Sequence, residues 1–286
     1  MKFCLRKVFL SIITLFALSI IPGKSPAYAL RYASGGDLVK WKESCFKYSV
    51  HEKGAPNVDF ENLSQAIRLS FDAWEDADCS YFYFEETENA SCTDIAFQEY
   101  AGNNNLIVFI DSEWEIEGNS NYSTGAIALT TISWDDLSGR ILDANIEFNA
   151  EYFTFSTDNS FMNTDIQNTA THEIGHMLGI EHSDVIGATM TPTANYGEIE
   201  KRTLEQDDID AVCELYPIED NPGICRDPYC GLDLSCSSTN CQNTGINYYP
   251  PEDTNNGCSF VYVTRSEKNK ATWFKMLSLL LLKIFL

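Results

Sequence analysis

Three of the chain's four histidines lie in one short segment, THEIGHMLGIEHSD, at residues 171–184. They are His172, His176 and His182, and Glu173 directly follows the first of them. Residues four apart share one face of an α-helix, so His172 and His176 can bind the same metal ion. Three imidazoles without a fourth protein ligand are typical of a catalytic zinc site, in which water takes the open position. The sequence therefore predicts one zinc ion held by these histidines.

Glu173 is not needed as a zinc ligand and is placed to act on water. Zinc lowers the pKa of a bound water to about 7, and a neighbouring carboxylate can then accept its proton. The same carboxylate can later deliver the proton to a leaving amine. These residues predict hydrolysis of a peptide bond, with Glu173 as the general base and acid. A non-protein amide is an alternative substrate for the same chemistry.

The complete spacing H-E-x-x-H-x-x-G-x-x-H resembles that of the metzincin metallopeptidases. Metzincins also carry a Met-turn below the zinc, and Met190 follows the third histidine at a matching distance. Ser183 and Pro192 resemble the matrixin branch, the relatives of the matrix metalloproteinases. Three further segments resemble matrixin elements: AIRLSFDAWED at 66–76, AIALTT at 126–131 and LEQDDIDAVCELYP at 204–217.

The resemblance implies an α+β fold of the zincin-like type. It implies a twisted mixed sheet of about five strands with three helices, and a cleft with zinc at its floor. Met190 would form the hydrophobic base of the site. Ala128 and Leu129 would lie on the edge strand that pairs with an extended substrate. Pro192 and Tyr196 would line the pocket for the residue after the scissile bond.

Two departures from the family concern latency and metal content. We find no cysteine-switch pro-peptide, which puts latency by a zinc-bound thiolate in doubt. Vertebrate matrixins bind a second, structural zinc through additional histidines, but His51 is the one histidine left here. We therefore expect a single zinc. The acidic loops 111–117 and 135–143 are candidates for calcium, or are simply solvated.

Three helices are expected to position these residues. Leu63, Ile67, Phe71 and Trp74 form one apolar stripe on the first. The second should run from about 165 to 178, with a capping box of Thr164 and Gln167 at its start. Gly179 can adopt the left-handed conformation that ends this helix and lets His182 return to the metal. The third should start with Thr203 and Gln206 and stop at Pro217.

Strand-like segments occupy residues 45–50, 79–85, 94–100, 105–111, 124–134 and 140–149. The first two flank a helix, which favours a parallel pair. Parallel neighbours begin side by side, so we predict a disulfide between Cys45 and Cys79. Ten cysteines in all fit an oxidising compartment.

The two ends of the chain have the composition of targeting segments. Residues 1–29 form a predicted signal peptide, with a basic start, an apolar run and a cleavage site at Ala27-Tyr28-Ala29. The predicted peptidase domain covers 30–217, and a Cys-rich appendage or stalk covers 218–258. The basic and hydrophobic tail, 259–286, is either a surface-sorting or anchoring signal, with Cys258 as the processed residue, or a terminal helix packed on the domain.

The formal net charge of −23 argues against nucleic-acid binding, which needs a basic surface. We expect a secreted protein, which the C-terminal tail could attach to a membrane or cell surface. A protein or peptide substrate is the predicted partner. The alternative function is a surface-anchored binding or adhesion module that keeps a vestigial zinc site.

Overall fold

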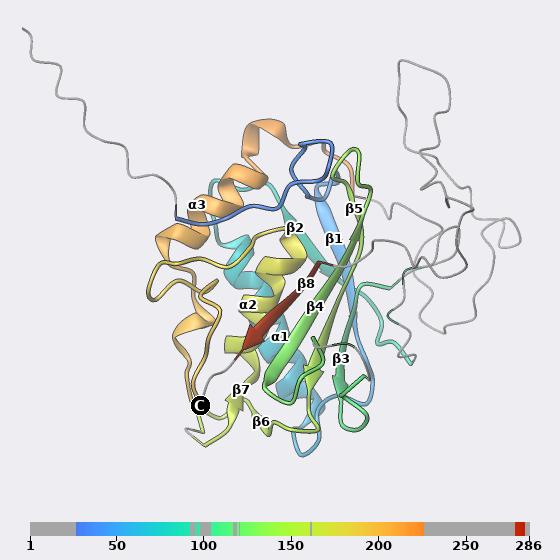
Figure 1. Cartoon of the computed structure of the whole chain (residues 1–286), viewed down its shortest axis with the longest axis vertical. Coiled ribbons are helices and arrows are strands. Elements are labelled where there is room, and N and C mark those ends of the chain that lie inside the picture. Colours follow the sequence, from blue (N-terminus) through green and yellow to red (C-terminus); the bar gives the residue numbers. More distant parts are fainter. Residues whose placement is uncertain are drawn as a thin grey trace, which may run out of the picture.

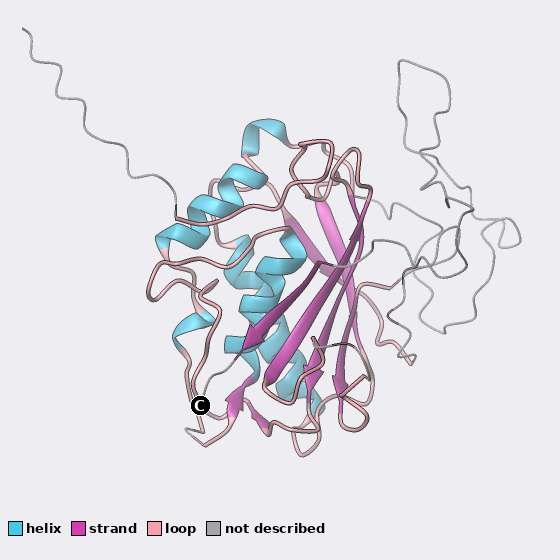
Figure 2. Ribbon diagram, viewed as in Figure 1, coloured by secondary structure: helices cyan, strands magenta, loops and turns pink. Residues whose placement is uncertain are grey.

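The computed structural model is a mixed β-sheet with α-helices packed against one face (Figure 1). It describes residues 27–91, 95, 97, 104–116, 119, 121–160 and 162–225, together with the backbone of residues 278–283. The strands form one layer and the two longer helices lie together beside it (Figure 2). The helices are α1 (Phe60–Glu75), α2 (Ile166–Leu178) and α3 (Gln206–Leu215), with two 3-10 turns, η1 (Glu200–Arg202) and η2 (Ile218–Asp220).

The large sheet has the strand order β2-β1-β3-β5-β4-β8. Its strands are β1 (Cys45–Val50), β2 (Tyr83–Glu86), β3 (Leu106–Ile110), β4 (Ala126–Trp134), β5 (Ile141–Asn149) and β8 (Ser278–Lys283). The strands β2, β1, β3 and β5 run parallel to one another, whereas β4 runs antiparallel to both β5 and β8. A second, two-stranded sheet joins β6 (Phe155–Ser156) to β7 (Thr164–Asp165). The predicted α+β architecture, a mixed sheet of about five strands with three helices, is confirmed.

The sixth strand comes from the distant C-terminal tail. Residues 278–283 form β8 on the outer side of β4, and not the terminal helix that was one of two predictions for the tail. Whether the tail is a sorting signal stays a prediction. No helix in the described part of the chain has the length and apolarity needed to span a bilayer. The strand predicted at 94–100 falls mainly outside the described residues.

Acidic side chains cap the starts of the helices. The capping residues of α2 and α3 therefore differ from those predicted from the sequence. Asp165, not Thr164, caps α2: its carboxylate accepts the N–H of Asn168 at 2.8 Å. Glu205, not Thr203, caps α3 in a capping box with Asp208. A carboxylate accepts backbone N–H groups and also complements the positive end of the helix dipole, which explains the preference. The apolar stripe predicted for α1 is buried as expected.

The predicted disulfide between Cys45 and Cys79 is wrong. Cys45 bonds Cys225 and Cys79 bonds Cys213. The strands β1 and β2 are parallel neighbours, as predicted. In their register, however, Cys45 lies opposite Tyr83. Cys79 therefore precedes β2 and lies beside α3. The two bonds tie the end of the described domain back to its start. The first residues of the predicted 218–258 appendage are thus attached to the domain, and 226–258 lie outside the described residues.

Apolar clusters cover both faces of the sheet. The largest fills the space between the sheet and the helices and contains Trp41, Phe71, Trp74 and Phe148 among many others. Two small clusters lie on the other face: one consists of Trp114, Tyr122, Ala126 and Leu129, and the other of Ala90, Leu106 and Val108. Because α2 belongs to the largest cluster, the predicted metal-binding helix is fixed on the sheet along its whole length.

Candidate metal centre

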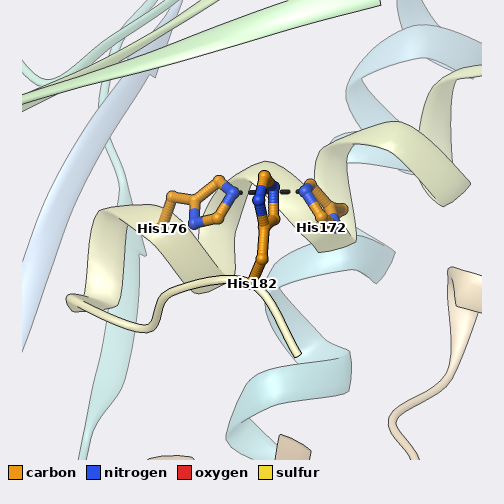
Figure 3. Close-up of side chains that lie close together, drawn as sticks. All are labelled: His172, His176 and His182. Carbon is orange, nitrogen blue, oxygen red and sulfur yellow. Dashed lines mark hydrogen bonds between the residues drawn. The ribbon is translucent and has the colours of Figure 1, made fainter. Parts of the chain in front are cut away.

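Helix α2 and the turn after it bring the three predicted histidines together. The imidazoles of His172, His176 and His182 point toward one another (Figure 3). One ligand nitrogen from each lies within 4.8 Å of the others, and the Nε2 atoms of His172 and His176 are 3.2 Å apart. The spacing predicted from the sequence therefore produces one cluster of three nitrogens.

Gly179 ends α2 in the conformation that the prediction required. Its φ is 99°, in the left-handed region, and its N–H donates to the carbonyl of His176. A Cβ at this position would lie 2.1 Å from the carbonyl oxygen of Val39. The turn therefore needs glycine for two reasons: its backbone angle, and the close approach of its Cα to the backbone of Val39.

Hydrogen bonds at the outer ring nitrogens orient two of the imidazoles. The Nδ1 of His172 lies 2.6 Å from the carbonyl oxygen of Thr189, and the Nδ1 of His176 lies 2.7 Å from that of Ile180. A carbonyl can only accept, so each Nδ1 carries the proton and each Nε2 offers its lone pair to the cluster. Metal-binding histidines commonly donate their outer ring N–H to a carbonyl or carboxylate in this way.

The electrostatics of the cluster favour neutral imidazoles. Burial lowers the pKa of His172 and His176 well below the ordinary value, and it lowers the pKa of His182 to about 4. Neutral imidazole is the form that binds metal. The buried Nε2 of His182 has no hydrogen-bond partner among the described residues, which is costly unless a ligand is present. The donor set therefore fits a zinc ion.

Glu173 is fully buried next to the histidines. Its Oε2 accepts the hydroxyl proton of Thr130 on β4 at 2.5 Å, while the buried Oε1 has no partner within the described residues. Burial raises the pKa of Glu173 to about 8, against the opposing effects of the Thr130 hydroxyl and of the positive charge of Lys201. One held oxygen and one free oxygen suit a group that exchanges protons with a bound water.

Met190 packs against helix α2 next to Gly175. It is fully buried, and a Cβ on Gly175 would come within 2.3 Å of its sulfur and 2.8 Å of Trp74. Glycine between the two helical histidines therefore lets the methionine pack against the helix. The carboxylate of Asp208 fixes the turn by accepting the N–H groups of Thr189 and Met190 at 2.7 and 3.0 Å.

Comparison with known proteins decides the family. The matrixin peptidase profile matches residues 40–217, which is more than half of the chain. The chain belongs to the matrixin family. The matched range includes residues 171–192 and 203–217, where the resemblance to matrixins is most specific.

Curated matrixins match over the same part of the chain. Karilysin of Tannerella forsythia is 30% identical over 177 residues, covering 62% of this chain and 33% of karilysin. Human neutrophil collagenase is 25% identical over 183 residues (64% and 34%), and human matrix metalloproteinase-16 is 27% identical over 187 residues (65% and 28%). The match thus spans about a third of the length of each relative.

The residues predicted to bind substrate occupy two segments of this matrixin. Ala128 and Leu129 are buried on β4, with Leu129 in a small cluster on the sheet face opposite α2. Pro192 is half-buried, and Tyr196 is exposed and lies beside the ring of Phe153. Their roles in binding stay predictions, as does calcium; in the loop 135–143 Asp135 accepts hydrogen bonds from its own turn.

Sequence reasoning missed four residues of the matrixin site, namely Thr130, Gly175, Lys201 and Asp208. Asp208 had a detectable signal, because it stands three residues after Glu205 and can close a capping box. Gly175 was visible as a helix-weakening residue between two ligands. Thr130 and Lys201 had no signal, since each reaches the site from a strand or turn that is distant in the sequence.

Proposed function

We propose that this matrixin is a secreted, zinc-dependent endopeptidase that cleaves proteins or peptides. His172, His176 and His182 hold the zinc, and Glu173 is the general base and acid. One observation carries this proposal above the others: two unpartnered polar atoms, Glu173 Oε1 and His182 Nε2, are buried in the same site. A zinc ion and a bound water would satisfy both atoms, because each lacks a partner among the described residues.

The residues of the chain have distinct tasks in this reaction. Zinc, when bound, supplies an acidified water and polarises the carbonyl to be cleaved. Glu173 accepts the water's proton on its free oxygen and returns a proton to the leaving amine. Thr130 holds the other oxygen and so orients the carboxylate. Met190 and Gly175 keep the floor of the site apolar and closely packed.

The outer edge of β4 is the proposed position of the substrate backbone. Residues 278–283 of the chain itself pair there in antiparallel register, with Leu281 opposite Leu129 and Leu280 opposite Thr130. This pairing supports the proposal, because an extended segment of the chain already forms a strand along this edge. On this proposal, the substrate backbone takes the position of β8.

A pair of substitutions tests the reaction and separates it from the alternative of a vestigial site. Zinc content is measured by elemental analysis, and cleavage is measured on casein and on a proteome-derived peptide library. We expect one zinc per chain in the wild type and in Glu173→Ala, with cleavage in the wild type alone. Glu52→Ala, an exposed glutamate, is the matched control and should cleave normally.

The other outcomes have clear meanings. Zinc binding with undiminished cleavage in Glu173→Ala would show that the assigned general base is wrong. A wild type that neither binds zinc nor cleaves any peptide would favour a binding or adhesion module. Zinc binding with cleavage of non-protein amides alone would point to the second alternative, a hydrolase of another substrate class.

A further inference from the structure

The strands at the two ends of the order β2-β1-β3-β5-β4 differ in composition. At one end lies β2, which has four residues, two of them Glu85 and Glu86. A short, charged edge strand does not readily pair with a further strand. At the other end lies β4, which has nine residues, carries no charged side chain and is almost entirely buried. Left uncovered, a strand of this kind presents a row of unpaired backbone N–H and C=O groups.

A distant segment of the same chain covers the edge of β4. Figure 1 shows β8 directly beside β4. The two strands pair in antiparallel register, from Ala126 opposite Lys283 to Ile132 opposite Ser278. The pairing therefore extends along most of β4. Because β5 already pairs with the other side of β4, only one further strand can bind to it, and in this structure that strand is β8.

The covered part of β4 includes the residue that holds the proposed general base. Thr130 lies opposite Leu280 of β8, and its hydroxyl donates to Oε2 of Glu173 at 2.5 Å. The proposed position of the substrate backbone is this same stretch of β4. A substrate and β8 therefore require the same backbone groups, and the two cannot occupy the edge together.

We propose that residues 278–283 act as an intramolecular inhibitor, and that the peptidase becomes active when this strand leaves the edge of β4. This inference rests on the proposed peptidase function and adds its regulation. Because β8 belongs to the same chain, it competes with substrate at a high effective concentration. Cleavage of the chain between 226 and 277 separates β8 from the domain, whose last described residue, Cys225, stays bonded to Cys45. The processing predicted at Cys258 falls within this range and would also release the inhibitor.

The first test compares the same protein before and after a cut. A recognition site for a highly specific protease is inserted between Lys270 and Ala271 of the full chain, which is folded and loaded with zinc before it is cut. We expect the cut to lower KM for a library-derived peptide by about tenfold or more, with kcat within about twofold, because β8 no longer competes with the substrate. A scrambled insertion at the same place, treated with the same protease, is the control and should keep the high KM.

A synthetic peptide tests whether the strand itself is the inhibitor. The peptide covers residues 275–283 and has a lysine at each end. It should bind to the cut protein in calorimetry and raise its KM again, and it should not bind to the intact chain. The KM of the intact chain should also stay constant over about a hundredfold range of enzyme concentration. A KM that falls on dilution would show that the strand comes from a second copy, and would overturn the intramolecular assignment.

Substitutions in β8 assign the inhibition to backbone pairing. Proline lacks the N–H group that a paired strand donates. The double variant Leu280→Pro, Leu281→Pro in the uncut chain should therefore lower KM as the cut does. The matched control is Leu280→Val, Leu281→Val, which keeps both N–H groups and favours an extended strand. This control should keep the high KM of the intact chain.

Hydrogen exchange makes the inference testable without cleavage. Residues 126–132 should exchange faster after the cut and in the proline variant, whereas residues 106–110 of β3, between β1 and β5, should not change. Faster exchange, together with binding of the 275–283 peptide to the cut protein alone, supports the inference even if no peptide is cleaved and the proposed function fails. Unchanged exchange and unchanged KM in both altered proteins overturn it. Faster exchange with an unchanged KM overturns it as well.

Discussion

Two buried glutamates on opposite sides of the sheet look alike in several respects. Glu173 on α2 is fully buried and Glu147 on β5 is 4% exposed. Burial raises the pKa of Glu173 to about 8 and that of Glu147 to about 7. Each accepts one hydroxyl proton, Glu173 from Thr130 at 2.5 Å and Glu147 from Tyr122 at 2.8 Å. Their immediate surroundings, however, differ completely.

The neighbours of each carboxylate separate the proposed general base, Glu173, from Glu147, for which we propose no catalytic role. Leu129 and Thr130 are consecutive on β4, so their side chains leave opposite faces of the sheet. Thr130 meets Glu173 beside three imidazoles, and Leu129 lies opposite Glu147 under an apolar cluster with Trp114. A raised pKa is therefore not enough to identify a catalytic residue. What marks Glu173 is an unpartnered oxygen in the site where the Nε2 of His182 also lacks a partner among the described residues.

The largest difference should appear when each glutamate is changed to glutamine. Glu173→Gln removes the proton acceptor and should lower kcat by about a thousandfold or more, because general acid–base groups contribute factors of this order. Glu147→Gln should leave kcat within about threefold, since it lies on the other face of the sheet. Steady-state cleavage of a library-derived peptide measures both, with zinc content confirmed for each variant. Comparable losses in the two variants would contradict the comparison.

The site was largely predictable, whereas the other face of the sheet was not. His172, His176 and Gly179 follow from helical spacing and turn chemistry within a few residues, which a sequence displays directly. Glu147 and Tyr122 belong to separate segments, and nothing in either one predicts the pair. The same limit explains the wrong partner for Cys45. The strand that pairs with the Cys45 strand was predicted correctly. The register of that pair, however, keeps Cys79 away from Cys45, whose disulfide partner is 180 residues away in the sequence.

The pH dependence of stability should differ between the wild type and Glu147→Gln. The pKa of about 7 in the folded state exceeds the ordinary glutamate pKa of 4.5, so the folded state binds more protons than the unfolded state between these two values. The free energy of unfolding should therefore fall as the pH rises from 4.5 to 7, by about 3 kcal/mol from this residue alone. Glu147→Gln lacks this contribution, and chemical denaturation of both proteins across the range measures the difference.

Two controls accompany this comparison. Glu115→Gln, at an exposed position, should follow the wild-type pH profile. Identical pH profiles for wild type and Glu147→Gln would show that ionising Glu147 does not lower the free energy of unfolding. A calcium-dependent increase in wild-type stability that disappears in Glu147→Gln would instead connect Glu147 with the calcium predicted for the loop 111–117, and would end its description as a purely structural residue.

Removing the hydroxyl that faces each carboxylate gives the smallest and most selective test. Tyr122→Phe leaves the buried Glu147 without its partner and should lower the free energy of unfolding by about 1–2 kcal/mol, because a buried acceptor loses its hydrogen bond. Thr130→Val should affect stability less and lower kcat by about tenfold, since Glu173 keeps its burial but loses its orientation. Denaturation and peptide cleavage are measured on both variants. If Tyr122→Phe lowers kcat as much as Thr130→Val does, the two faces of the sheet are coupled and the separation between a reactive and a structural glutamate fails.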